Sequence, residues 1–339
     1  MGVRAGLARA VEAAAILGTE KSFLRNGVIG DPELNRRGLH RWRVATAARL
    51  SEARRRRMAG RIAEADRAAL DRDGFVIKPD FLDPETFRAV RDAAFGRPHR
   101  AHEQRQGETV TRHVALGGTG LAPLRAVARR RDVADLMGYA AGRSGAPAMF
   151  LQAVLAEPGR GGADPQTDLH ADTFHPTAKL WLFLTDVGEA DGPFVFAPGS
   201  ARLTPERLAW EYEQSLTARD DPRRHHAIGS FRIAPEAIAG LGYRAPRRVT
   251  VKANTLVVAN TWGFHKRAPS TRPTTRVELY GSLRRNPFVP WNGLDPAALV
   301  TPYQSDAFFG WLALRKRLLG GRAVWTDVGE TPIDGPALS

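Results

Sequence analysis

The spacing of apolar residues changes along this 339-residue chain. Residues 1–20 and 38–72 carry apolar residues at helical spacing among many Ala, Arg and Glu, which are good helix formers. After a turn at residues 73–74, the pattern predicts a short strand at Phe75–Lys78. A helix should begin after Asp83, because this N-cap residue precedes a proline and an acidic first turn. The pattern thus predicts helices, one short strand and another helix.

Beyond residue 145 the predicted elements are mainly strands. Each is short, rich in Val, Leu, Phe and Trp, and bounded by Gly, Pro, Asp or Asn. This pattern is typical of antiparallel strands in a sandwich or barrel rather than of alternating βαβ units. Residues 203–245 interrupt the strands with helical and loop sequence. The predicted strands lie within residues 148–159, 179–187, 192–200, 247–260 and 275–285. The expected fold class is α+β, mainly β with flanking helices.

Composition restricts the chemistry that the chain can perform. Hydrophobic residues make up 43% and charged residues 25%, which permits a sizeable core and a folded globular protein. Cysteine is absent, so any metal must bind to His, Asp or Glu. No apolar run reaches the roughly 18 residues of a membrane-spanning helix. The apolar N-terminal stretch is interrupted by Glu12 and lacks a convincing cleavage site, so we expect a cytoplasmic protein.

Positive charge is concentrated near the N-terminus. The net charge is +14, and residues 1–66 hold 14 Lys and Arg against 7 Asp and Glu, a net +7. The run Arg54–Arg57 is either a solvated basic helix face or a contact for an anionic lipid, a nucleic acid or an acidic partner. No zinc finger, helix-turn-helix or RNA-stacking pattern accompanies it, so nucleic acid is not the expected partner. A weak association of residues 1–66 with an anionic surface is the alternative.

One short motif offers candidate metal ligands. His170 and Asp172 precede the predicted strand at 179–187, and His265 follows a predicted strand in "NTWGFHKRAPS". All three lie at strand ends, where they can meet on one rim of a jelly roll. Two imidazoles and one carboxylate on one face of an octahedral metal leave three positions open, as in non-haem Fe(II) oxygenases. A His-x-Asp pair alone is common, so the distant histidine carries the interpretation.

An arginine follows this histidine closely in the sequence. Arg276 lies 11 residues after His265, within a predicted strand. A buried arginine in a strand needs a partner, and a guanidinium fork matches carboxylate oxygens. Arg276 is therefore the candidate anchor for the far carboxylate of a dicarboxylate cosubstrate.

Four segments between about residues 68 and 290 together resemble one enzyme family. They are "DGFVIKPDFLDPETFRAVRDA", "HAD" at 170–172, "WLFLTDVGEADGPFVFAPGS" and "NTLVVANTWGFHKRAPSTRPTTR". In these segments the chain resembles the phytanoyl-CoA dioxygenase (PhyH) family of Fe(II)/2-oxoglutarate-dependent hydroxylases. The resemblance implies a double-stranded β-helix (a cupin-like jelly roll) with His170, Asp172 and His265 as iron ligands. It also implies that Arg276 holds the C5 carboxylate of 2-oxoglutarate, with Gln152 and Lys179 as candidates for further cosubstrate contacts.

The resemblance further implies the reaction. Fe(II), 2-oxoglutarate and O2 would combine to give succinate, CO2 and an oxidised substrate, with no side-chain nucleophile. Related halogenases have a small residue where Asp172 stands, so Asp172 favours hydroxylation or another oxidation. Two positions depart from the family: Ala201 replaces a histidine, and Glu278 stands where similar enzymes often carry Ser or Thr. Glu278 is expected to point away from the cosubstrate or to pair with Arg276.

Three parts of the chain are expected: a basic helical extension at 1–66, the dioxygenase domain at 67–300, and a C-terminal helix and tail at 301–339 packing on the core. The expected substrate is a small organic molecule, anionic or lipid-like, walled by residues 95–125 and 203–248. The anionic character is inferred from Arg223, Arg224, Arg247 and Arg248. Two alternatives stay open: a cupin-like metal-containing module that binds or senses a ligand without turnover, and a basic adaptor built on a β-scaffold. The sequence leaves the oligomeric state open.

Overall fold

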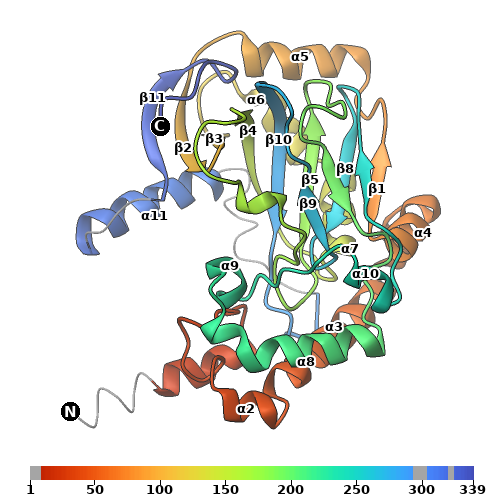
Figure 1. Ribbon diagram of the computed structural model, residues 1–339. Coiled ribbons are helices and arrows are strands. Elements are labelled where there is room, and N and C mark those ends of the chain that lie inside the picture. The colour runs from red at the N-terminus through yellow and green to blue at the C-terminus, as the bar shows by residue number, and fades with distance from the viewer. Residues whose placement is uncertain (1–8, 293–303, 320–323) are drawn as a thin grey trace.

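The computed structural model describes residues 9–292, 304–319 and 324–339, which are built around two antiparallel sheets (Figure 1). The larger sheet has the strand order β1-β8-β5-β10-β4-β3-β2-β11, and the smaller has the order β7-β6-β9. The larger sheet contains β1 (Phe75–Lys78), β2 (His99–Gln106), β3 (Thr109–Ala115), β4 (Ala148–Ala156), β5 (Ala178–Phe183), β8 (Leu256–Asn260), β10 (Thr274–Leu283) and β11 (Thr326–Thr331). The smaller sheet contains β6 (Phe194–Phe196), β7 (Arg247–Val249) and β9 (His265–Arg267). This arrangement confirms the predicted jelly-roll core with flanking helices.

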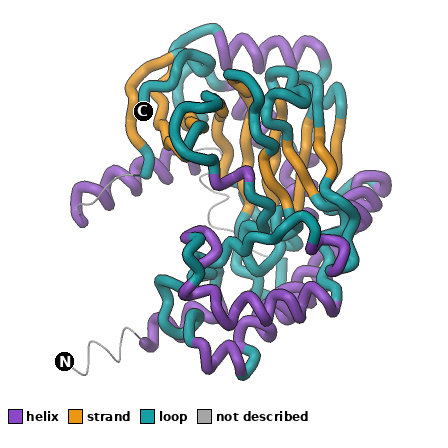
Figure 2. Tube along the Cα trace, viewed as in Figure 1, coloured by secondary structure: helices purple, strands orange, loops and turns teal. Residues whose placement is uncertain are grey.

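Helices lie against the outer face of the larger sheet and at one end of the strands (Figures 1 and 2). Helices α5 (Pro84–Phe95), α6 (Ala122–Ala128) and α7 (Arg131–Ala140) pack their apolar faces on the larger sheet. Another group, α2 (Pro32–Arg36), α3 (Leu39–Met58) and α8 (Pro205–Thr217), lies together at one end of the strands. Other helical elements are η1 (Ala15–Leu17), η2 (Ala59–Arg61), α4 (Glu64–Asp73), η3 (Pro165–Thr167), η4 (Ala218–Asp220), α9 (Arg224–Ala227), α10 (Ala237–Gly240) and α11 (Gln304–Leu319).

Strand β5 shows how the sequence fixes the two faces of the larger sheet. Side chains alternate along a strand, so Leu180 and Leu182 join the core that the helices cover. Trp181 and Phe183 point the other way and join a second core that also contains Phe196 of the smaller sheet. Burial on both faces explains why this strand reads as a continuous apolar run. Trp181 and Phe183 therefore lie on the face of the larger sheet that points towards the smaller sheet.

Two local boundaries agree with the sequence prediction. α4 ends at Asp73, and its C-cap residue Gly74 has a φ of 88°, which lies in the left-handed region. A Cβ at this glycine would lie 2.8 Å from the Cβ of Ala201 and 3.0 Å from the ring of Phe196, so only glycine fits between α4 and β1. α5 begins after Asp83, whose carboxylate accepts a 2.8 Å hydrogen bond from the backbone N–H of Thr86.

Within residues 95–125, β2 and β3 form a hairpin that the sequence pattern did not predict. These strands carry polar or charged residues at most positions, which hides the alternation that identifies a half-buried strand. β11 pairs with β2, so the C-terminal tail extends the larger sheet. No helix in the described ranges is long and apolar enough to cross a membrane.

The arginine run at 54–57 is not a uniform solvated face. Arg54 of α3 is fully buried, and burial lowers its pKa to about 10. Its guanidinium donates hydrogen bonds to the carbonyl oxygens of Gly142, Pro287 and Val289, at 2.7, 3.0 and 2.6 Å. Arg56, in contrast, is exposed. The expectation of a solvated face is therefore wrong for Arg54, which fastens α3 to the rest of the protein.

Candidate active site

Backbone pairing brings the three candidate metal ligands together. His265 is the first residue of β9, and His170 forms an antiparallel bridge with it. The N–H of His170 donates to the carbonyl of His265 at 3.0 Å, and the N–H of His265 donates in return at 2.9 Å. The N–H of Asp172 donates to the carbonyl of Thr261 at 3.0 Å. Segments about 90 residues apart in the sequence are thereby held in one place.

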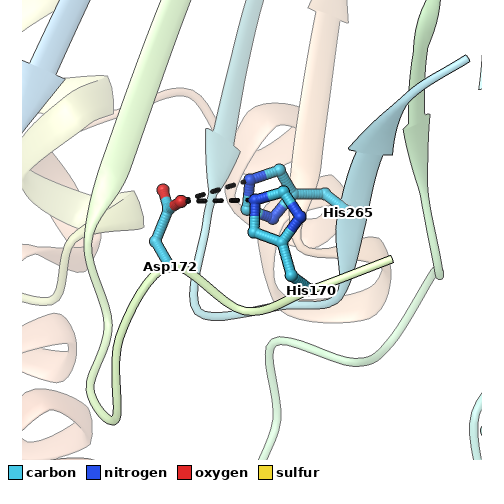
Figure 3. Close-up of side chains that lie close together, drawn as sticks. All are labelled: His170, Asp172 and His265. Carbon is cyan, nitrogen blue, oxygen red and sulfur yellow. Dashed lines mark ion pairs between the residues drawn. The ribbon is translucent and has the colours of Figure 1, made fainter. Parts of the chain in front are cut away.

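The side chains converge as well (Figure 3). Oδ1 of Asp172 lies 3.7 Å from Nε2 of His170 and 3.6 Å from Nε2 of His265. The candidate ligand atoms all lie within 4.8 Å of one another. Two atoms that each lie about 2.1 Å from a shared ion are separated by at most about 4.2 Å. These donors therefore need little movement to share one ion.

The hydrogen bond of Nδ1 in each histidine determines the tautomer and leaves Nε2 available to a metal. Nδ1 of His170 lies 2.7 Å from the carbonyl oxygen of Asp168, and Nδ1 of His265 lies 2.9 Å from that of Gly263. A carbonyl oxygen only accepts, so each Nδ1 carries the proton and each Nε2 presents a lone pair. Nε2 of His265 is buried without a hydrogen-bond partner among the described residues. This donor set fits a metal ion.

Charges near Asp172 keep the site ready for a cation. Nζ of Lys179 lies 2.8 Å from Oδ2 of Asp172, which leaves Oδ1 facing the histidines. Burial alone would raise the pKa of Asp172, but Lys179 and the two histidines outweigh it and hold this pKa well below its usual range. Burial lowers the pKa of His170 and brings that of His265 to about 3. The carboxylate is thus ionised and both rings are neutral, as metal binding requires.

Both histidines of the triad border a cavity of about 210 Å³ between the two sheets. His170 and His265 form part of its wall, and Lys179, Gln152 and Arg276 line it as well. The structure thus brings five of the candidate site residues together around one cavity. Asp172 is not among the lining residues, although its carboxylate faces the two histidines.

The Arg276 side of the cavity is a chain of buried polar side chains. Nε of Arg276 lies 2.8 Å from Oε2 of Glu278, and one Nη donates to the carbonyl oxygen of Gly192 at 2.8 Å. Gln152 donates from Nε2 to Oε1 of Glu278 at 2.6 Å. The amide oxygen of Gln152 must then accept, so Nε2 of His113 donates to it at 2.6 Å. Glu278 is therefore paired with Arg276, one of the two arrangements expected from the sequence.

The register of the paired strands explains this row of hydrogen-bonded side chains. Glu278 of β10 stands opposite Gln152 of β4, which stands opposite His113 of β3. His113 and the lining residue Trp325 were not predicted as site residues. Trp325 precedes β11 in the C-terminal tail, and its ring stacks on that of His113 at 4.5 Å. Only the pairing of distant strands reveals these neighbours.

The arginines that suggested an anionic substrate lie elsewhere. Arg223 pairs with Asp221, and Arg248 pairs with Glu189. No residue of 203–248 lines the cavity, whereas β2 and β3 within 95–125 contribute to its wall. The expectation for these arginines is therefore wrong, and only the first of the two predicted walls borders the cavity.

Comparisons with known proteins support the family resemblance. The model of the phytanoyl-CoA dioxygenase (PhyH) family matches residues 70–233, which include His170 and Asp172. No curated protein matches the chain significantly.

Three of the solved structures that are similar to this chain are the following. The epimerase SnoN, in complex with Fe3+, alpha ketoglutarate and nogalamycin RO, is 20% identical, with 69% of this chain and 92% of that chain covered and a TM-score of 0.42. The alpha ketoglutarate dependent carbocyclase SnoK from nogalamycin biosynthesis is 18% identical, with 68% and 89% covered and a TM-score of 0.41. HygX from Streptomyces hygroscopicus, with nickel and 2-oxoglutarate bound, is 14% identical, with 69% and 91% covered and a TM-score of 0.40.

Proposed function

We propose that the chain is an Fe(II)/2-oxoglutarate-dependent oxygenase that hydroxylates a small organic substrate, and the PhyH match and the His-Asp-His triad support this proposal. The reaction would release succinate and CO2. The single observation that carries the proposal is the convergence of two free Nε2 lone pairs on one ionised carboxylate oxygen. Such a ligand set leaves open positions for a cosubstrate and O2.

We propose that His170, Asp172 and His265 hold the iron. Bound there, iron would supply the oxidising chemistry, and the residues of the chain would position the reactants. The carboxylate of Asp172 favours hydroxylation over halogenation, because it takes the place that a halide would need. Phe183, Phe194 and other aromatic side chains in the cavity wall would exclude water from the reacting groups.

Arg276 is the proposed anchor for the C5 carboxylate of 2-oxoglutarate. Its guanidinium has five N–H donors. Glu278 lies along the Nε edge, and the carbonyl of Gly192 takes one donor of an Nη. One N–H on each Nη therefore remains for a carboxylate at the end of the fork, which is a bidentate geometry. The ion pair with Glu278 supports the anchor by fixing the orientation of the guanidinium.

Lys179 and Gln152 are proposed to position neighbouring residues rather than to contact the cosubstrate. Lys179 binds Oδ2 of Asp172, and Gln152 joins Glu278 to His113. We propose that each acts on its own end of the cavity by positioning a neighbouring charged side chain.

The proposed dioxygenase domain at 67–300 includes both ends of the cavity. The flanking regions at 1–66 and 301–339 are proposed to be integral to it rather than independent. Two contacts support this assignment: Nζ of Lys21 donates to the carbonyl oxygen of Asp172 at 2.5 Å, and Trp325 stands in the cavity wall.

A screen of succinate release tests the proposed function. The full chain would be incubated with Fe(II), 2-oxoglutarate and O2 over a library of small molecules, and substrate products would be identified by mass spectrometry. We expect substrate-dependent succinate release with addition of one oxygen atom to the substrate. A protein that binds Fe(II) and 2-oxoglutarate but gives no product with any compound would support a binding module instead.

A further inference from the structure

We propose that the substrate is a neutral, polyhydroxylated small molecule of the sugar or cyclitol type, which the wall formed by β2, β3 and η3 recognises. This inference rests on the proposed function, since it names the substrate class of the same cavity. It replaces the anionic or lipid-like substrate that the sequence suggested.

The first support is a group of polar side chains without protein partners. Four residues of the cavity wall carry amide or hydroxyl groups for which no side-chain hydrogen bond exists among the described residues. They are Gln104, Gln106, Thr111 and Gln166. Amides and hydroxyls both donate and accept, as the hydroxyl groups of a sugar do. A wall of this kind is complementary to several neighbouring hydroxyl groups.

The second support is the charge of the cavity. Its wall holds four cationic side chains, of which Lys266 has no ion pair with a described residue. The other three are neutralised in the pairs Lys179 with Asp172 at 2.8 Å, Arg267 with Asp164 at 3.0 Å and Arg276 with Glu278 at 2.8 Å. The double positive charge of Fe(II) would be balanced by the two carboxylates of 2-oxoglutarate. Among the cations of the cavity wall, Lys266 therefore remains for an anionic substrate.

A third argument disfavours an acyl chain. Methylene groups packed against the amides of Gln104, Gln106 and Gln166 would remove them from water without replacing their hydrogen bonds. Each unsatisfied polar group costs about 1–3 kcal/mol. A hydroxylated substrate avoids this cost.

The aromatic part of the wall suits the remaining surface of such a ring. Trp325, Trp181 and Tyr280 all line the cavity. Sugars and cyclitols present C–H groups as well as hydroxyls, and aromatic side chains offer apolar faces beside polar edges. Hydroxyl recognition on β2 and β3, with C–H contact on the aromatic rings, would orient one carbon towards the metal end.

Equilibrium binding to matched probes tests the inference. The full chain, loaded with Mn(II) in place of Fe(II) and with 2-oxoglutarate to prevent turnover, would be titrated calorimetrically. The probes are neutral hexoses and inositols, the corresponding hexose 6-phosphates and hexuronic acids, deoxy analogues, and medium-chain fatty acids. We expect at least one neutral polyol to bind 10-fold or more tightly than its charged or deoxy counterpart. Tighter binding of the phosphates, the uronic acids or the fatty acids would overturn the inference, as would binding of no polyol.

Variants of the wall provide the second arm. Gln104→Leu with Thr111→Val should weaken binding of the neutral polyol at least 10-fold. The matched control Gln214→Leu alters an amide on α8 outside the cavity wall and should leave this binding unchanged. Equal polyol affinity of the wall variant and the wild type would overturn the assignment. Binding of 2-oxoglutarate by the wild type separates the two proposals, because its absence would contradict the proposed function itself.

Discussion

The two ends of the cavity hold their functional groups by different means. At the metal end, the Nδ1 groups of His170 and His265 each donate to the carbonyl oxygen two residues earlier in the chain. At the other end, Arg276 is oriented by Glu278, which in turn depends on Gln152 from another strand. The two histidine rings are thus oriented by the local backbone, whereas the Arg276–Glu278 pair is held through side chains of two other strands, β4 and β3. Damage at the metal end should therefore stay local, whereas damage at the Arg276 end should also reduce stability.

Removal of a metal ligand is the strongest test of this contrast. Asp172→Ala deletes the carboxylate that faces both histidines. Loss of an outer partner of a ligand weakens metal binding about 10–100-fold, so loss of the ligand should weaken Fe(II) binding by more than about 100-fold. Succinate formation should disappear while the circular dichroism spectrum stays native. Fe(II) titration and a succinate assay measure the two effects.

Glu189→Gln is the matched control, because it removes an exposed carboxylate that pairs with Arg248. It should leave metal binding and turnover unchanged. Native-like Fe(II) affinity in the Asp172→Ala protein would refute the ligand assignment.

A single and a double variant at the Arg276 end should separate cosubstrate binding from stability. Arg276→Met leaves the fully buried Glu278 without its cation, and breaking a buried ion pair costs about 3–5 kcal/mol. The affinity for 2-oxoglutarate should also fall about 10–100-fold, since a bidentate pair between charged groups is lost. Adding Glu278→Gln should restore most of the stability but not the affinity. Urea unfolding and 2-oxoglutarate titration measure the two quantities.

Either of two results would contradict this account. Unchanged 2-oxoglutarate affinity in Arg276→Met would place the anchor on another cation. Full recovery of affinity in the double variant would show that the single variant acts only through the unpaired Glu278.

The same contrast explains which parts of the site could be predicted from sequence. The spacing of His170 and Asp172, and the position of His265 at the start of a strand, appear directly in the sequence because backbone pairing does the rest. Helix boundaries at Gly74 and Asp83 follow from backbone chemistry in the same way.

The other parts depend on pairings that spacing does not encode. His113 meets Gln152 only because β3 lies beside β4 in a particular register. β2 and β3 escaped prediction because their inner faces line a polar cavity and so lack apolar alternation. Arg54 looked like its neighbours in the arginine run, and only the carbonyl groups of distant loops distinguish it.

Two substitutions in the arginine run of α3 should differ in their effect on stability. Arg54→Leu should leave buried carbonyl oxygens without donors, among them those of Gly142 and Pro287, and reduce the free energy of unfolding by about 2–5 kcal/mol. The neighbouring Arg56→Leu changes an exposed side chain and should stay within about 0.5 kcal/mol of the wild type. Equal stability of the two variants, measured by urea unfolding, would contradict the stabilising role of Arg54.

The smallest expected effect is the pH dependence contributed by His113 at the Arg276 end. Burial lowers the pKa of His113 from 6.5 to about 4. Between these values the unfolded chain binds a proton on this residue and the folded protein does not, so stability should fall as the pH drops from about 6.5 to about 4. One such group contributes about 1.4 kcal/mol per pH unit. His113→Gln keeps a donor for Gln152 but cannot titrate, so its unfolding free energy, measured in chelator, should vary less steeply with pH by this amount. An identical slope in the variant and the wild type would mean that His113 is protonated alike in the folded and unfolded states, which would contradict the neutral, Nε2-protonated ring inferred for this end of the cavity.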